Sequence, residues 1–428
     1  MRMVPAATVS FVVQIGGGVL SALTNVYLAW ALGPAQKGAA QVLVIVPAIL
    51  VVVSNLGVHT AGAWFIGRRR YPLADVLSAM FWWAIIVSAA VAVPLWLFRT
   101  PIRAVVFAGI EPRLVWIALG CLPFYVLAYY VADVLLASGR LLTYGVLRLL
   151  PLVVYGVFAL LLVGVRGMGL TGATVAFSSG IVASGLFALG VVLRLSRGRL
   201  APHGDVMRHA LGFGGYVHVG AVAQFLVFKI DVVIVNALGG PVAAGVYALA
   251  ASIAETVWYV GRSVESVILP RIARARGTEA QQISATALRV TAGGSVLVAA
   301  GLAIAAPTLV TALLPAYGAA IRLLWLLLPA AVIAGVYIVA AGDLRGRGQP
   351  AVVAVVSVCA LVANVALNLA LVPMFGATGA AAVSLATYAA EAIVAAHLLS
   401  SASGVRYRSM MFVRRDDLRL FRAITHQP

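Results

Sequence analysis

The sequence predicts an all-α polytopic membrane protein with about twelve transmembrane helices in two six-helix lobes. Of the 428 residues, 63% are hydrophobic and 10% are charged, and the mean hydropathy is +1.07. Soluble domains have roughly a quarter of their residues charged, so a chain with this few charged residues is suited to a lipid environment. Apolar runs of about 20 residues, enough to cross ~30 Å of hydrocarbon as helix, recur along the chain. An internal repeat divides these runs into two equal sets.

The first six helices are expected at apolar runs that charges and helix breakers separate. The spans are 6–31, 41–66, 77–98, 114–138, 143–164 and 169–193. Typical junctions are "GRRRYP" at 67–72 and "EPR" at 111–113, which combine charge with proline. The first run is longer than the apolar core of a secretory signal, and no small-residue cleavage site ends it. We therefore expect a retained helix.

The last six helices follow a basic connection, "RLSRGRLAPHGD" at 194–205. The expected spans are 211–235, 243–269, 286–306, 321–341, 351–372 and 377–400. Every connection is too short for a soluble catalytic domain, and no Cys or His residues have metal-ligand spacing. Cys121 and Cys359 fall within predicted helices of opposite halves, where we expect apolar packing rather than a disulfide. The sequence therefore predicts no enzyme, no cofactor and no metal site.

The net charge of +18 indicates topology rather than nucleic-acid binding. With these spans, the side that holds both termini carries Arg2, Arg68, Arg69, Arg70, Arg140, Arg194, Arg197, Arg199, Arg208, Arg271, Arg274, Arg276, Arg345, Arg347 and the arginines after Ser400. The opposite side carries only Lys37, Arg99, Arg103, Arg113, Arg166 and Arg322. This imbalance is typical of the positive-inside rule, so we expect both termini in the cytoplasm. The basic residues there would contact anionic membrane lipids.

The sequence repeats itself at an offset of about 207 residues. The segment "ALGPAQKGAAQV" from Ala31 is similar to "ALGGPVAAGVYA" from Ala237, and one inserted residue then pairs Gly38 with Gly245. The same offset pairs Gly139-Arg140 with Gly346-Arg347, and "GLTGA" at 169–173 with "GATGA" at 376–380. Each marker lies at an equivalent junction, where glycine permits tight connections and close backbone approach.

Because each half has an even number of helices, the two halves enter the membrane in the same orientation as parallel repeats. We expect an N-terminal lobe at 1–200, a C-terminal lobe at 201–400 and a basic cytoplasmic tail at 401–428. Two lobes with a cleft between them are typical of a transporter.

These motifs resemble those of the O-antigen type polysaccharide flippases in the multidrug/oligosaccharidyl-lipid/polysaccharide exporter superfamily. The matching segments are "LGP" with Gly38, "LGGPVAAGVYALA" at 238–250, "GLTGATVA" and "FGATGAAAVSLATYAAEA". The resemblance implies two bundles in a bacterial cytoplasmic (inner) membrane. It also implies export of a lipid-linked oligosaccharide, on an undecaprenyl-pyrophosphate type carrier, by alternating access.

A polar stripe runs along the predicted helix 243–269. Its members, spaced at three and four residues, are Ser252, Glu255, Tyr259, Arg262 and Ser266. They fall within about 80° of one helix face, which therefore either lines a water-filled cavity or is buried as an ion-pair staple, with Arg262 on Glu255 or Glu265. We interpret the stripe as cavity-lining. The repeat maps Arg262 and Ser266 onto Asn55 and His59, so the first half has an equivalent polar face.

Helices 6–31 and 211–235 also correspond, with Asn25 at the position of Asp231. Lys229 and Asp231 are about 200° apart around their helix, so each needs its own partner. Lys229 either meets substrate or pairs with a carboxylate such as Asp133 or Glu255. Arg148 either snorkels to the interface or joins the substrate site.

A phosphate-linked substrate fits the sign of these groups, since an anionic head group needs cationic donors. We expect substrate contacts from Arg262, Lys229, Arg148, Tyr259, Asn55 and His59. Asp231, Glu255 and Asn25 are the candidates for coupling to H⁺ or Na⁺. The alternative is a cation-coupled multidrug antiporter of the same superfamily. The first three predicted helices contain no Asp or Glu, and this favours the flippase.

Overall fold

The computed structural model describes residues 3–213 and 215–403, and throughout these it is helical with no strand. In the first half the helices are α1 (Met3–Ser54), α2 (Val58–Gly67), α3 (Leu73–Leu97), α4 (Arg99–Val105), α5 (Pro112–Gly120), α6 (Leu122–Ala137), α7 (Leu141–Ala159, continued by a π segment to Val165) and α8 (Gly169–Leu195). The tail expected at 401–428 lies outside the described residues, apart from its first three.

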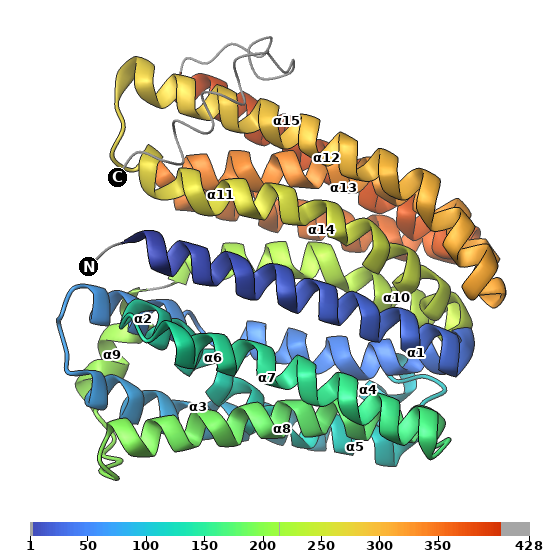
Figure 1. Ribbon diagram of the computed structural model, residues 1–428, viewed down its shortest axis with the longest axis horizontal. Coiled ribbons are helices and arrows are strands. Elements are labelled where there is room, and N and C mark those ends of the chain that lie inside the picture. Colours follow the sequence, from blue (N-terminus) through green and yellow to red (C-terminus); the bar gives the residue numbers. More distant parts are fainter. Residues whose placement is uncertain (1–2, 214, 404–428) are drawn as a thin grey trace. The chain divides into compact units, whose positions relative to one another are not determined.

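The second half begins with a connecting helix, α9 (Gly204–Phe213), and continues with long helices (Figure 1). These are α10 (Gly215–Ala254, continued by a 3₁₀ turn to Val257), α11 (Trp258–Ile272), α12 (Gly277–Leu313), α13 (Gly318–Gly346), α14 (Pro350–Phe375) and α15 (Ala377–Ser403). The fold class predicted from the sequence is therefore confirmed.

Helices α1 and α10 each contain two membrane crossings, because the backbone leaves the helical region at Gly33 (φ 68°) and Gly240 (φ 79°). The side chains of Asn25 and Lys37 meet at 2.7 Å although an uninterrupted helix would place them about 18 Å apart. Ten segments are long and apolar enough to span a membrane. Since two of them double back in this way, the described chain accommodates the twelve predicted crossings.

The second predicted span, 41–66, is not continuous. It breaks between α1 and α2, where Leu56 and Gly57 both have positive φ (50° and 75°). The amide N–H of Gly57 donates to Oδ1 of Asn55 (2.8 Å), which satisfies a backbone donor that the break exposes. The broken span therefore fixes the position of Asn55.

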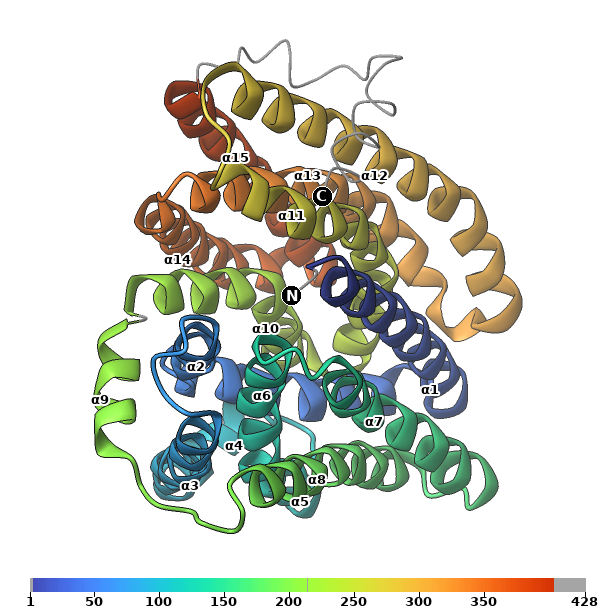
Figure 2. The same ribbon diagram turned by 60° about the vertical axis from the view of Figure 1, so that its left-hand side comes forward.

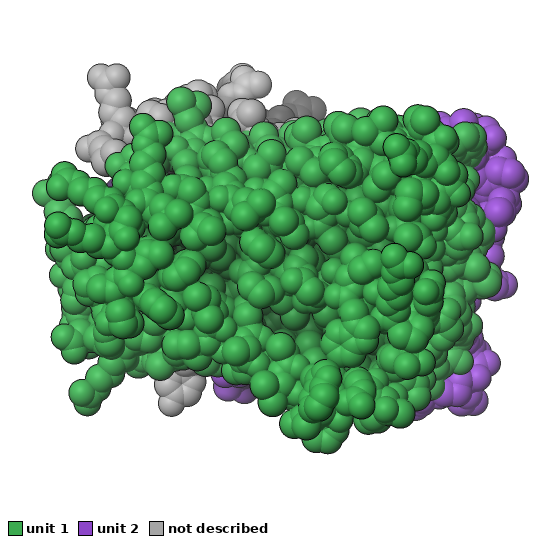
Figure 3. Space-filling view, turned by 90° about the horizontal axis from the view of Figure 1, so that it is seen from below, with its two compact units in different colours: residues 1–218, 232–245 green, residues 219–231, 246–428 purple. Residues whose placement is uncertain are grey.

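The described residues form two compact units (Figure 3). Among the described residues, unit 1 comprises those up to His218 together with 232–245, and unit 2 comprises 219–231 together with those from Val246 onward. The boundary therefore runs through α10, whose first residues up to His218 and whose segment Val232–Gly245 belong to unit 1. In unit 2 the core lies between α11, α12 and α13, around Ile268, Tyr337 and Leu344.

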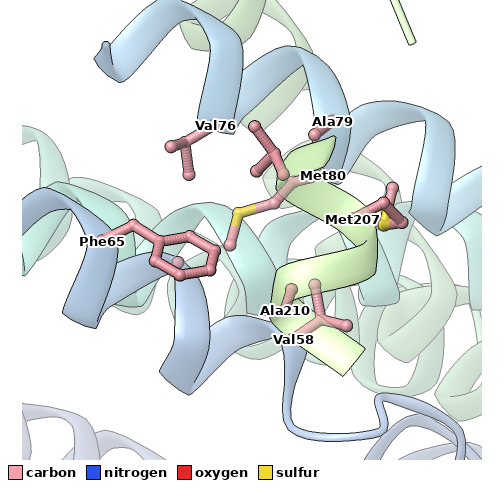
Figure 4. Close-up of a pocket in the computed structure, with 9 residues that line it drawn as sticks. Val58, Phe65, Val76, Ala79, Met80, Met207 and Ala210 are labelled. Carbon is pink, nitrogen blue, oxygen red and sulfur yellow. The ribbon is translucent and has the colours of Figure 1, made fainter. Parts of the chain in front are cut away.

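Helix α9 packs on unit 1 beside α2 and α3, and Figure 2 shows it alongside them. Nδ1 of His209 lies at hydrogen-bonding distance (2.9 Å) from the hydroxyl oxygen of Tyr71. Nε2 of His203 lies 3.5 Å from a carboxylate oxygen of Asp75. A small pocket between the three helices has an apolar lining that includes Phe65, Met80 and Met207 (Figure 4). Its lining contains no charged or hydroxyl side chain.

Candidate functional site

In unit 1, the predicted residues Asn55 and His59 lie together at the break before α2. Asn55 is buried, and its Oδ1 lies 2.8 Å from Nδ1 of His59. The other imidazole nitrogen of His59 is 3.9 Å from a carboxylate oxygen of Asp133 on α6. The ring of Tyr129, one turn earlier on α6, lies 4.9 Å from the imidazole. The two positions that the internal repeat maps onto the polar stripe are thus part of a connected group of polar side chains in unit 1.

Arg148 on α7 belongs to the same region. Its guanidinium lies 5.9 Å from the ring of Tyr144 and interacts electrostatically with Asp133 and Tyr129. Arg148 forms no ion pair within 4 Å with any residue that the structure describes, and part of the residue reaches the surface while protein surrounds its guanidinium. Unit 1 therefore presents a cation beside a carboxylate, an imidazole and two phenols.

Asn25 has a different environment from the one that the sequence suggested. Its Oδ1 accepts a hydrogen bond from the ammonium of Lys37 (2.7 Å), which also donates to Oε1 of Gln41 (2.8 Å). Lys37 is 3% exposed, although sequence analysis treated it only as a charge in a connection. The side-chain amide oxygen of Asn25 is therefore already hydrogen-bonded to the ammonium group of Lys37.

In unit 2, Lys229 pairs with Glu255, one of the two outcomes foreseen. The ammonium and carboxylate lie 2.5 Å apart, and each side chain is 26% exposed. The ammonium also lies 6.0 Å from the ring centre of Trp258, within cation–π range. Lys229 and Asp231 take separate partners, as their angular separation on the helix predicts.

Three of the other stripe residues lie on an exposed face of α11, whereas Ser252 lies on α10 and is half-buried. The side chains of Tyr259, Arg262 and Ser266 are all exposed. No ion pair within 4 Å joins Arg262 to Glu255 or Glu265 in the described residues. Glu255 pairs with Lys229, and Glu265 pairs with Arg345 (2.5 Å) and interacts more weakly with Arg262.

Asp231 lies at the centre of a buried polar cluster. Its carboxylate accepts hydrogen bonds from Ser384 (2.6 Å), Tyr247 (2.9 Å) and Asn368 (2.9 Å). Asn368 is also bonded to Asn364 (3.0 Å between Nδ2 and Oδ1), so α10, α14 and α15 all contribute. All of these donors are neutral. A buried carboxylate with neutral partners is costly in its charged form, so the cluster has the character of a cation site.

None of the partners of Asp231 in this cluster was predicted from the sequence, and neither was Glu391. Glu391 is 2% exposed and lies within unit 2. A signal was nevertheless present, because Ser357, Asn364 and Asn368 share one face of α14, and Ser384 and Glu391 share one face of α15. Polar side chains that recur at helical spacing in the last two helices therefore indicate these residues.

Comparison with known proteins assigns the family. The family model described as "polysaccharide biosynthesis protein" matches residues 27–317, and the chain belongs to this family. The chain is similar to the lipid II flippase MurJ in an inward closed conformation (13% identity, 93% of this chain and 88% of that chain, TM-score 0.76). No curated protein sequence matches the chain.

Two multidrug transporters have the same fold. One is an inward-facing MATE family transporter of the MOP superfamily (14% identity, 92% of this chain and 99% of that chain, TM-score 0.74). The other is the MATE multidrug transporter DinF-BH (18% identity, 96% of this chain and 95% of that chain, TM-score 0.66). The protein is thus a multi-pass helical membrane protein with the fold of MOP-superfamily flippases and transporters.

Proposed function

We propose that this protein moves a lipid-linked oligosaccharide from the cytoplasmic to the outer leaflet of a bacterial cytoplasmic membrane by alternating access. The carrier would be of the undecaprenyl-pyrophosphate type, and both termini would lie in the cytoplasm. The observation that carries the proposal is the match to the polysaccharide biosynthesis family on a fold shared with the lipid II flippase.

The cationic side chains of each unit are suited to the pyrophosphate. Arg262 in unit 2 is exposed, and neither it nor Arg148 in unit 1 has an ion-pair partner within the described residues. A guanidinium offers a planar fork that matches phosphate oxygens. Tyr259 beside Arg262, and Asn55 with His59 near Arg148, supply the neutral groups that sugars need.

Lys229 and Glu255 would act as an exchange pair. Both side chains are partly exposed, so a phosphate and a proton can reach them. If Glu255 binds a proton, the ammonium of Lys229 loses its counter-charge and becomes available to an anionic head group. The two residues would thus link ion binding to substrate binding.

Asp231 would bind the coupling H⁺ or Na⁺. Its three neutral donors come from α10, α14 and α15, so neutralising the carboxylate would change the packing of three helices at once. In unit 1 the corresponding Asn25 is already bonded to the ammonium of Lys37. We therefore assign the binding site of the coupling cation to unit 2. In unit 1 the ammonium group of Lys37 supplies the positive charge beside Asn25.

The test uses cells depleted of the protein. Carrier-linked intermediates are extracted, and an impermeant sugar-modifying reagent on intact cells shows which leaflet holds the glycan. We expect a completed oligosaccharide lipid to accumulate facing the cytoplasm. An unchanged lipid pool would overturn the flippase assignment.

A cation-coupled multidrug antiporter is the second candidate, favoured by the shared fold of the MATE transporters and by the buried Asp231. It predicts that depletion leaves the lipids unchanged and sensitises cells to cationic dyes. Dye accumulation in the same depleted cells therefore separates the two functions.

A further inference from the structure

Unit 2 contains a second buried carboxylate, Glu391 on α15, that the proposed coupling step does not use. Its Oε2 accepts a hydrogen bond from the amide Nε2 of Gln224 on α10 (3.4 Å). Its Oε1 has no hydrogen-bond partner among the described residues. A buried, half-partnered carboxyl group in a lipid-solvated bundle is costly and calls for a functional explanation.

Glu391 belongs to a chain of hydrogen bonds. Oε1 of Gln224 accepts from the hydroxyl of Ser357 on α14 (3.0 Å), and that hydroxyl lies 3.0 Å from the phenol oxygen of Tyr337 on α13. Four helices therefore contribute one side chain each. With the exception of Gln224, which is half-buried, these side chains are almost fully buried.

This chain lies two helical turns from the Asp231 cluster on three separate helices. The matched pairs are Asp231 and Gln224 on α10, Asn364 and Ser357 on α14, and Ser384 and Glu391 on α15. Seven residues advance a helix by about 10.5 Å and return to the same face. The two clusters are therefore stacked layers of one polar file through unit 2.

An unsatisfied polar atom lies in the interval between the layers. The hydroxyl of Thr387, between Ser384 and Glu391 on the same face of α15, is buried without a hydrogen-bond partner among the described residues. Tyr388 interacts electrostatically with both Asp231 and Glu391. A buried hydroxyl group without a partner can pass on a proton, or bind a water molecule that carries it.

We propose that Glu391 is a second proton-binding site, which relays a proton between Asp231 and the cytoplasmic side of unit 2. The proposal rests on the proposed coupling by Asp231. In the relay, the carboxylate of Glu391 gains the proton that the carboxyl group of Asp231 gives up, so the buried charge stays constant. Proton transfer along a file of hydroxyl groups and carboxyl groups needs no open channel.

A proton fits this site better than a metal cation does. Gln224 points its N–H donor at Glu391, and a donor repels a metal ion from the oxygen it contacts. The titratable groups that face Glu391 are Tyr337 from α13 and Tyr388 on its own helix, with no cationic side chain among the described residues. Among the described residues no group of three acidic, His or Cys side chains is arranged to hold a metal.

The file continues toward the surface. Tyr337 also interacts electrostatically with Glu265 and Arg345, which form an ion pair in which the arginine side chain is 37% exposed. Arg345 lies in the last turn of α13, in the group of residues that the charge distribution assigns to the cytoplasm. A proton on Glu391 therefore has a polar route to water on that side.

The test is infrared difference spectroscopy of the full-length protein in lipid vesicles during a pH titration. A protonated carboxylic acid has a C=O stretch distinct from that of a carboxylate. We expect one such band to be lost in Glu391→Gln and a different one to be lost in Asp231→Asn. The exposed Glu279→Gln on α12 is the matched control and should leave both bands unchanged. Retention of every buried-acid band in Glu391→Gln would overturn the proposal.

A second variant covers the case in which Glu391→Gln does not fold. Gln224→Leu removes the donor to Oε2, so we expect the Glu391 band to move to higher wavenumber while the Asp231 band stays. A band unmoved by Gln224→Leu would overturn the assignment. Because these spectra need no glycolipid, the relay can fail while the flippase assignment holds. Equally, an unchanged lipid pool in depleted cells would not remove the Glu391 band.

Discussion

Gly38 and Gly245 lie in reciprocal backbone contact. A Cβ atom added to Gly38 would lie 2.7 Å from the amide nitrogen of Gly245 and would overlap the carbonyl oxygen of Pro241. A Cβ atom added to Gly245 would lie 3.0 Å from the amide nitrogen of Gly38 and would overlap the carbonyl oxygen of Pro34. The two glycines are paired by the 207-residue offset, so the repeated segment forms both sides of one symmetric contact within unit 1.

This contact predicts that Gly38→Ala destabilises the protein. The added methyl group meets backbone atoms, which cannot rotate away, and overpacking costs about 1–3 kcal/mol. We expect a lower unfolding temperature in detergent and reduced abundance. Gly190→Ala is the matched control, since that helical glycine has open space around it and should be neutral or slightly stabilising. Equal effects of the two substitutions would contradict the close approach.

The buried Lys37 predicts an interaction with Asn25 that a double-mutant cycle can measure. Asn25→Leu removes one of the two acceptors of the ammonium, and we expect a loss of about 1–3 kcal/mol in unfolding free energy. Lys37→Met removes the charge with similar volume, so the double variant should recover much of that loss. Thermal unfolding of all four proteins gives the coupling, and strictly additive effects would show that the hydrogen bond is unimportant.

The Lys229–Glu255 pair predicts a separation of stability from transport. Lys229→Met leaves a partly buried carboxylate without its cation, so abundance should fall. The double variant Lys229→Met/Glu255→Gln should restore abundance, because no unpaired charge remains. Export should stay impaired in both. Wild-type export in the stable double variant would exclude a role for the pair in transport.

Asp231→Asn is expected to uncouple transport while it preserves the packing of the cluster. The amide has the shape of the carboxylate but cannot bind a proton and holds a cation weakly. Coupling free energies of 1–3 kcal/mol correspond to roughly 5- to 150-fold effects, so export driven by an ion gradient should fall within this range. Asp205→Asn on the exposed start of α9 serves as the control. Full gradient-driven export by Asp231→Asn would place the coupling group elsewhere.

Arg262→Ala is expected to lower export without loss of stability, because the exposed guanidinium has no ion-pair partner among the described residues. A charge-assisted hydrogen bond contributes about 1.5–3 kcal/mol, which is roughly a 10- to 150-fold loss at the bound phosphate. Arg345→Ala, which breaks the Glu265 pair, should lower the unfolding temperature instead. Unchanged glycolipid export by an abundant Arg262→Ala protein would remove this residue from the substrate site.

Much of the candidate site was predictable from helical periodicity. Asn55 and His59 were found because the repeat maps them onto the polar stripe of the second half, and Arg262 because charge is rare in membrane helices. Partner choice was not predictable. The sequence offered both Asp133 and Glu255 as partners for Lys229. Only the reversal of α10 at Gly240 brings the carboxylate of Glu255 to 2.5 Å from the ammonium of Lys229.

The sequence by itself determined the helical class, the number of crossings and the repeat, because these follow from apolar length, charge distribution and local spacing. Only the tertiary structure decided that Lys37 is buried, that Asp231 is joined by Asn368 and Ser384, and that Glu391 lies in a second layer. Periodicity fixes the face of a helix on which a side chain lies. It does not fix which other helix that face meets, and the partners of Asp231 and Glu391 on other helices lie more than a hundred residues away along the chain.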